Sequence, residues 1–227
     1  DQSPGARRTM SAFSPDWLDT REPWDHRARS PEITVAMVRW LERLDREGPT
    51  RILDLGCGTG STLRYLAPHL PAPLAWTLAW TLADGDTRLL GIAAQSLGAT
   101  IVEADLSTAD LGSLVDRHDL VTASALLDLV SETWLDRLWS AVERRRAGLL
   151  AGLSYDGRIA VTPSAPLDAV IGNLINRHQQ GDKGFGRAMG PLATAALSTR
   201  ARRAGWRVMV RRSDWKLSAL ADGPGLA

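Results

Sequence analysis

The chain has 227 residues, a length that suits one domain or one domain with a small appendage. Hydrophobic residues make up 44% and charged residues 23%, a globular composition that argues against wholesale disorder. The 27 basic and 26 acidic residues give a net charge of +1, which makes no general case for a polyanionic partner. The single cysteine excludes an internal disulfide and a cysteine-cluster metal site, and it fits the reducing cytoplasm, where we expect the protein to be located. No apolar run reaches the roughly 18 residues of a membrane span, so none is predicted.

Predicted strands and helices alternate along most of the chain. The expected strands are 51–55, a strand that ends at 82–83, 100–104, 120–123, 148–153 and 206–210. The expected helices are 16–20, one that starts near Ser30, 61–66, 87–97, 132–146, 167–176 and 192–204. Such alternation is typical of parallel β-α-β units with right-handed crossovers. The sequence therefore predicts a doubly wound, mostly parallel, Rossmann-like α/β sheet with helices on both faces, and a seventh strand is not evident.

Three segments depart from this alternation. Residues 1–30 are expected to form an N-terminal tail and cap segment ahead of a single domain over 31–227. The tetrapeptide Leu-Ala-Trp-Thr occurs twice, at 74–77 and 78–81, which we interpret as a local duplication that lengthens a loop or a strand. Residues 163–191 break the pattern after the fifth strand, so we expect them to form an insertion over the carboxyl edge of the sheet.

A glycine-rich turn, Asp-Leu-Gly-Cys-Gly-Thr-Gly at 54–60, links the first predicted strand of the sheet to the next helix. Glycine lets a ligand approach the backbone and permits positive φ angles. Ligands of open α/β sheets bind outside the carboxyl ends of the strands, where this turn lies. A dinucleotide fingerprint needs G-x-G-x-x-G, but the third glycine, Gly60, comes one position early, and the expected slot is Ser61. A phosphate-binding P-loop is excluded, because no Gly-Lys-Ser/Thr follows.

Acidic residues follow the next two strands. Asp84, with Asp86 as the alternative, can accept hydrogen bonds from both hydroxyls of a ribose. Asp105 stands where a carboxylate can accept from an adenine amino group. Each of these residues could instead cap a helix, because each lies at a strand-to-helix junction.

Residues 52–60 resemble motif I of the class I S-adenosylmethionine-dependent methyltransferases, and Asp84, Asp105 and the run 119–124 are similar to later motifs of that family. The resemblance covers roughly residues 32–155. It implies an enzyme that uses S-adenosylmethionine and no metal. The implied cofactor contacts are Asp54, Gly56, Cys57, Gly58, Gly60, Asp84, Gly85, Asp105, Leu106 and Ser124.

Among these contacts, the resemblance implies that Asp54 supports the cofactor's amino group and that the region of Ser124 flanks the reacting methyl group. In related methyltransferases a segment before motif I often caps the cofactor. Arg29 or Arg21 is therefore expected to pair with the carboxylate of its methionine part.

No obligatory catalytic motif is expected. Methyl transfer from a sulfonium is an in-line displacement on an activated electrophile, so the enzyme mainly supplies alignment and a dry site. A general base is needed only where the acceptor must lose a proton. The candidates are His178, whose ordinary pKa suits neutral pH, and Tyr155 after the fifth strand.

The expected acceptor is an O or N atom of a small molecule. The alternative is methylation of RNA, such as rRNA, by arginines that track phosphates. These arginines are Arg144, Arg145, Arg146, Arg200, Arg202, Arg203, Arg207, Arg211 and Arg212. Amino methylation of DNA is disfavoured, because 124–127 reads Ser-Ala-Leu-Leu where such enzymes carry Asn/Asp-Pro-Pro-aromatic. Methylation of cytosine C5 is disfavoured because it needs a nucleophilic cysteine, and the single cysteine lies in the glycine turn.

Overall fold

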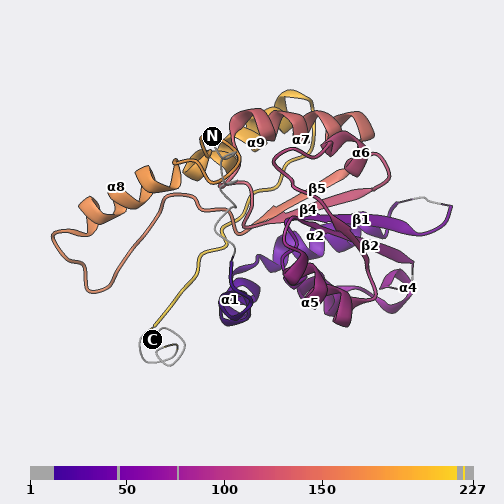
Figure 1. Cartoon of the computed structure of the whole chain (residues 1–227), viewed down its shortest axis with the longest axis horizontal. Helices are drawn as coiled ribbons and strands as arrows, with labels where there is room; N and C mark the ends of the chain where they lie inside the picture. Colours follow the sequence, from indigo (N-terminus) through magenta and orange to yellow (C-terminus); the bar gives the residue numbers. More distant parts are fainter. Residues whose placement is uncertain (1–12, 45–46, 76, 219–221, 223–227) are drawn as a thin grey trace, which may run out of the picture.

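The structure, a computed structural model, describes residues 13–44, 47–75, 77–218 and Asp222 (Figure 1). Its centre is a five-stranded sheet in the order β3-β2-β1-β4-β5, and every pair of neighbouring strands is parallel. The strands are β1 (Thr50–Leu55), β2 (Leu78–Asp84), β3 (Thr100–Glu103), β4 (Leu120–Ser124) and β5 (Gly148–Gly152). The strand order reverses between β1 and β4, which creates a crevice at their carboxyl ends.

Helices cover both faces of this sheet, so the predicted fold class is confirmed. The helices are α1 (Pro15–Ala28), α2 (Pro31–Leu41), α3 (Ser61–Leu66), α4 (Ala72–Ala75), α5 (Thr87–Leu97), α6 (Leu111–Val115), α7 (Glu132–Arg145), α8 (Asp168–Gln179) and α9 (Ala193–Arg203). In Figure 1, α6, α7 and α9 lie on one side of the sheet, and α2 and α5 on the other. Side-chain caps fix several of the starts, since Ser30 accepts from the backbone N–H of Ile33 and Ser131 from that of Trp134.

The core consists of apolar side chains from both faces of the central strands. On one face, Leu53 and Val121 pack with Leu135 and Leu138 of α7. On the other face, β1, β4 and α2 meet around Ile52, Leu120 and Leu41. Burial of each such side chain contributes about 1.5–3 kcal/mol. The sheet that carries the glycine turn is therefore packed against apolar side chains on both of its faces. None of the helices in the described ranges combines the length and the apolar character needed to cross a bilayer.

The predicted sixth strand at 206–210 is wrong. This segment is irregular and pairs with no strand among the described residues. Trp206 packs edge-on against Trp139 of α7, with ring centroids 5.0 Å apart, and Val208 also lies against the core. Trp206 and Val208 are thus partly buried on a helix layer instead of in a sheet ladder, and Val210 is exposed. As a result β5 is the edge strand, and its residues are only half-buried.

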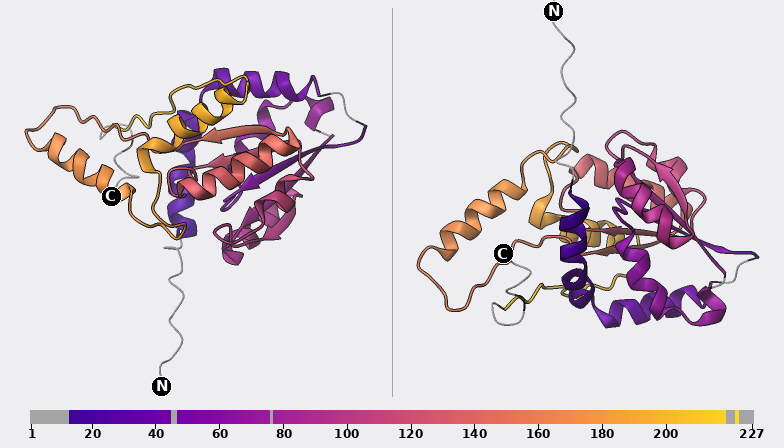
Figure 2. Two further views of the ribbon diagram at one scale, coloured as in Figure 1. Left: turned by 90° about the horizontal axis from the view of Figure 1, so that it is seen from above. Right: turned by 60° about the horizontal axis from the view of Figure 1, so that its bottom comes forward.

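The insertion after β5 has two parts. Helix α8 projects from the body of the protein, as Figures 1 and 2 show, and none of its residues is buried. It therefore does not cover the carboxyl edge as predicted. The following loop returns to the core, where Phe185 packs edge-on against Trp134 and the backbone N–H of Met189 donates to Val130 O at 2.7 Å.

The duplicated tetrapeptide takes two conformations. Its first copy lies at the end of α4, with Trp76 outside the described residues, and its second copy begins β2. The expected N-terminal tail lies outside the described residues up to residue 12, and the rest of it leads into α1.

Candidate functional site

The glycine turn after β1 needs its glycines for backbone conformation. Gly56, Gly58 and Gly60 have φ angles of +66°, +54° and +88°, in the left-handed region that side chains disfavour. The turn is held to β2 because the backbone N–H groups of Gly56 and Cys57 both donate to Ala83 O, at 2.9 and 3.2 Å. The backbone of the turn is thus fixed at the carboxyl edge of the sheet.

Asp84, at the end of β2, faces this turn. Its Oδ2 accepts from the backbone N–H of Gly58 and its Oδ1 from that of Asp86, both at 2.9 Å. Each carboxylate oxygen has a second lone pair that remains available to a ligand. Asp86 is instead a helix cap, the alternative that the sequence left open, because it accepts from the backbone N–H groups of Arg88 and Leu89 at the start of α5. The hydrogen bond from the Arg88 side chain also lowers the pKa of Asp86.

The residues after β2 and β3 lie farther along the same edge. Asp105 is exposed, and its Oδ1 accepts from the N–H and the hydroxyl of Ser107, at 3.0 and 2.6 Å. It does not cap a helix, because Asp110 caps α6. Leu106 is buried, and its carbonyl accepts from Trp134 Nε1 at 2.6 Å. A Cβ at Gly85 would lie 3.5 Å from the carbonyl oxygen of Ala104, so the two loops lie close together.

Two buried groups of opposite charge lie beside the turn. Asp54 is 1% exposed, and its Oδ1 accepts from the Thr122 hydroxyl at 2.6 Å, while its Oδ2 has no partner. The Arg29 guanidinium donates from Nη2 to Ser124 Oγ at 2.9 Å and stacks on the Tyr65 ring, while its buried Nε has no partner. A buried polar atom without a partner costs free energy. Two such atoms in one place therefore point to a ligand.

Burial also changes the ionisation of this pair. It raises the pKa of Asp54 to about 6, although the Thr122 hydroxyl, the charge of Arg29 and the Thr62 hydroxyl act in the opposite direction. Burial likewise lowers the pKa of Arg29, with the charge of Asp54 opposing it. Perturbed groups of this kind cluster at functional sites.

Helix α1 lies over the start of α3. Glu22 forms an ion pair with Arg64, and His26 Nε2 lies 3.1 Å from Ser61 Oγ. A Cβ on Gly58 would lie 3.4 Å from the Leu18 side chain, so α1 also covers the turn. Of the two candidate arginines, Arg21 pairs with Asp25 at 2.8 Å. Arg29 is therefore the arginine beside Asp54.

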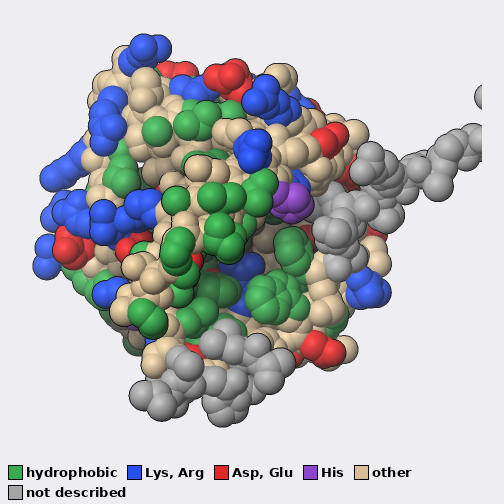
Figure 3. Space-filling model, turned by 90° about the vertical axis from the view of Figure 1, so that its left-hand side faces the viewer, with side chains coloured by type: hydrophobic (Ala, Val, Ile, Leu, Met, Phe, Trp, Pro, Cys, Tyr) green, Lys and Arg blue, Asp and Glu red, His purple; other side chains and the backbone are tan. Residues whose placement is uncertain are grey.

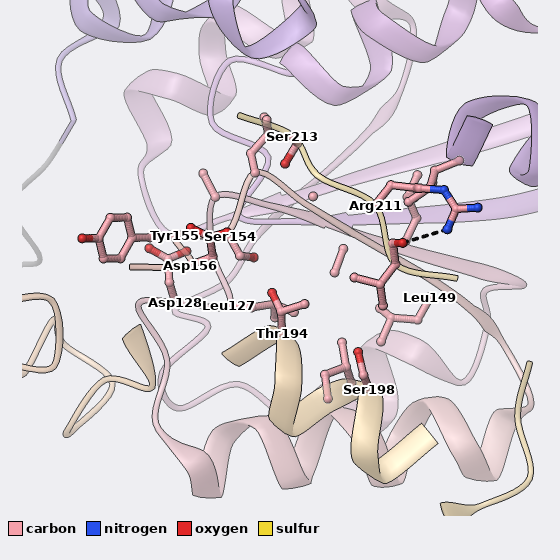
Figure 4. Close-up of a pocket in the computed structure, with 18 of the residues that line it drawn as sticks. Leu127, Asp128, Leu149, Ser154, Tyr155, Asp156, Thr194, Ser198, Arg211 and Ser213 are labelled. Carbon is pink, nitrogen blue, oxygen red and sulfur yellow. Dashed lines mark hydrogen bonds between the residues drawn. The ribbon is translucent and has the colours of Figure 1, made fainter. Parts of the chain in front are cut away.

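A wide groove, separate from the glycine turn, runs along β5. Its volume is about 2790 Å³, and its walls come from the ends of β4 and β5, helix α9 and the C-terminal segment. Figure 4 shows its lining at Leu127, Asp128, Leu149, Ser154, Tyr155, Asp156, Thr194, Ser198, Arg211 and Ser213. The space-filling view of Figure 3 shows a hollowed face with apolar side chains around the hollow and basic side chains inside it.

The two predicted catalytic residues both line this groove. The Tyr155 hydroxyl donates to Asn176 Oδ1 of α8 at 2.7 Å, and burial raises its pKa. His178 is exposed at the end of α8, where its Nδ1 lies 3.4 Å from Lys183 Nζ. The structure thus brings the predicted cofactor residues together at one edge, and it places Tyr155 and His178 in a neighbouring space.

Several residues of the site were not predicted. Thr122 could have been found, because β4 pairs with β1 in the register Asp54↔Thr122, and a polar residue in a buried central strand is unusual. Asp128 gave no sequence signal, since it stands in an apolar run. Within the described residues, no group of His, Cys, Asp and Glu side chains could hold a metal ion.

Comparison with known proteins gives structural neighbours only. No family model and no curated protein sequence matches the chain. The citrinin polyketide synthase CMeT domain is similar with a TM-score of 0.44 and 21% identity, over 53% of this chain and 33% of that chain. The CurJ carbon methyltransferase gives a TM-score of 0.41 and 20% identity, over 52% and 33%. The plantazolicin methyltransferase BpumL, in complex with SAH, gives 0.39 and 20%, over 56% and 48%.

This chain spans between a third and a half of the length of those neighbours. An S-adenosylmethionine-dependent methyltransferase from Clostridium acetobutylicum is also similar, with a TM-score of 0.38 and 17% identity, over 56% of this chain and 46% of that chain. These similarities cover 52–56% of this chain.

Proposed function

We propose that the chain is a methyltransferase that binds S-adenosylmethionine and transfers its methyl group to an O or N atom of a small molecule. The observation that carries this proposal is the pair of unpartnered buried atoms, Asp54 Oδ2 and Arg29 Nε. A free α-amino acid group carries an ammonium that donates to a carboxylate and a carboxylate that accepts from a guanidinium. The methionine part of S-adenosylmethionine supplies both charges.

The same pair argues against a dinucleotide. NAD has no ammonium group, and its pyrophosphate would lie at the turn, beside the buried carboxyl group of Asp54. Two negative groups in a low-dielectric site repel strongly. A dinucleotide would therefore leave Asp54 unpaired and add a like charge near it.

The other ligand contacts follow the carboxyl edge of the sheet. Asp84 has a free lone pair on each oxygen for the ribose hydroxyls. Asp105 and Leu106 follow β3 at the same edge, and we assign the adenine to them. The three glycines keep side chains off the ligand. These placements support the proposed cofactor contacts, including Gly85 and the backbone of Cys57.

When bound, S-adenosylmethionine supplies a methyl group that is already activated on a sulfonium. The protein then has to hold the amino-acid end, which Asp54 and Arg29 would do, and to exclude water, which Leu18 of α1 and Leu126 would favour because they lie against the turn. A Cβ on Gly56 would lie 3.4 Å from Leu126. Ser124 joins Arg29 to the end of β4, and the next residue, Ala125, lines the groove.

The ion pairs of the basic residues favour a small-molecule acceptor over RNA. Several arginines of the RNA alternative are already paired with carboxylates: Arg144 with Asp116, Arg145 with Asp119, Arg200 with Asp136 and Glu132, and Arg211 with Glu32. A paired arginine gains less from a phosphate than an unpaired one, because the existing ion pair must break.

Calorimetry with the full chain tests the proposal. S-adenosylhomocysteine should bind and NAD should not. Asp84→Asn should weaken that binding by about tenfold, the loss of one charged hydrogen bond. Asp116→Asn, on the exposed end of α6, is the matched control and should bind normally. Binding of NAD without S-adenosylhomocysteine would overturn the proposal, and salt-sensitive binding of RNA would favour the alternative acceptor.

A further inference from the structure

A second buried carboxylate, Asp128, lies in the wall of the groove. It follows β4 by four residues, is 8% exposed, and its Oδ1 has no hydrogen-bond partner. Figure 4 shows it at the groove beside Ser154 and Tyr155, which come from the end of β5. An unpartnered oxygen on a buried carboxylate costs free energy unless a ligand supplies a donor.

The backbone on either side fixes the position of this carboxylate. The N–H of Gly190 donates to Asp128 O at 2.9 Å, and the N–H of Met189 donates to Val130 O at 2.7 Å. The loop that returns from α8 therefore holds the segment in place. Because the segment is held on a rigid scaffold, the position of Asp128 in the lining of the groove is fixed.

The charges that face Asp128 do not neutralise it directly. Burial raises the pKa of Asp128. The backbone N–H groups of Asp128 and Tyr155 lower this pKa by hydrogen bonding, and Arg21 of α1 and Lys183 of the returning loop lower it through their charge, but burial has the stronger effect. Arg21 is engaged with Asp25, and Lys183 Nζ lies 3.4 Å from His178 Nδ1. Burial of the carboxyl group thus favours uptake of a proton.

We propose that Asp128 accepts the hydrogen bond, and during transfer the proton, of a protic acceptor: a hydroxyl or N–H compound with an apolar body. This inference rests on the proposed function. The acceptor's lone pair forms the bond to the methyl carbon, and the carbon–sulfur bond breaks with its electron pair left on sulfur. The acceptor's proton passes to Asp128 Oδ1. The apolar body fits the groove because Leu127, Leu149 and Trp17 line it.

The test compares two probes that differ in one hydrogen-bond donor. The affinities of benzyl alcohol and benzyl methyl ether for the full chain, saturated with S-adenosylhomocysteine, are measured by ligand-observed NMR. The alcohol should bind about tenfold more tightly, the value of one hydrogen bond to a charged group. In Asp128→Asn the preference should fall at least threefold, because the neutral amide is a weaker acceptor. Asp116→Asn, a carboxylate outside the groove, should keep it.

Equal affinities of the two probes for the wild-type chain would overturn the inference, and so would an unchanged preference in Asp128→Asn. If that variant does not fold, the comparison in the wild-type chain alone decides. The proposed function fails separately, if S-adenosylhomocysteine does not bind. In that case the probe preference, measured without it, still shows whether Asp128 acts as an acceptor.

Discussion

The buried charge of Asp54 should lower the free energy of unfolding, although the same charge is expected to bind the ammonium group of the cofactor. The pKa of Asp54 is raised from 3.8 to about 6 by burial. At about 1.4 kcal/mol per pH unit, the ionised carboxylate therefore costs the folded state about 3 kcal/mol. Well below pH 4 both the folded and the unfolded chain hold the proton, and the cost vanishes. It grows as the pH rises from about 4 to about 6 and is complete above that range.

Asp54→Asn removes this charge and keeps the shape of the side chain. Without ligand, the variant should be more stable than the wild-type chain by up to about 3 kcal/mol at pH 7–8, and the difference should shrink toward zero near pH 4. Urea denaturation, followed by tryptophan fluorescence from pH 4 to 8, measures both chains. The same variant should bind S-adenosylhomocysteine at least tenfold more weakly, because the ligand's ammonium loses its charged partner.

Ligand binding should also release a proton. An ammonium beside Asp54 favours its ionised form and lowers its pKa, so a chain that is partly protonated near pH 6 loses that proton on binding. Calorimetry in buffers of different ionisation enthalpy detects the release. A stability difference between the two chains that does not change with pH, together with no proton release, would refute the reasoning about Asp54.

Three further changes test other parts of the site. Gly58→Ala should lower the free energy of unfolding by about 1–2 kcal/mol, because φ is +54° and the new methyl group would approach Leu18; chemical denaturation measures this. Arg29→Lys should weaken S-adenosylhomocysteine binding about tenfold in calorimetry, because lysine lacks the planar guanidinium. The pKa of Asp222 is lowered to about 2 by its bond from Arg27, so its attachment to α1 should weaken as the pH falls from about 4 to 2, whereas Asp222→Asn should lack this acid transition in tryptophan fluorescence.

The sheet and the glycine turn could be predicted because their signals are local. Periodicity locates the strands, and the spacing of Gly56, Gly58 and Gly60 is readable without a structure. The predicted sixth strand failed for a non-local reason. The alternation at 206–210 is real, but Trp206 finds a partner in Trp139 across the fold, and no local pattern reports whether an apolar face meets a helix or a strand.

The roles of the acidic residues also depend on contacts that a local sequence pattern does not report. Asp84 and Asp86 are two residues apart at one junction, and local reasoning allows either of them to cap α5. The structure separates them, because Asp86 bonds forward to the helix and Asp84 bonds across to Gly58. Only the second bond depends on the neighbouring strand.

The two proposals have one physical basis, which is a buried carboxylate with an unpartnered oxygen. In a well-packed protein most buried polar atoms are paired, so an exception needs an explanation. Asp54 lies near the end of β1 and Asp128 follows β4, and the carboxyl ends of these neighbouring strands flank the point where the strand order reverses. The amino-acid end of S-adenosylmethionine would thus satisfy Asp54, and the protic acceptor would satisfy Asp128.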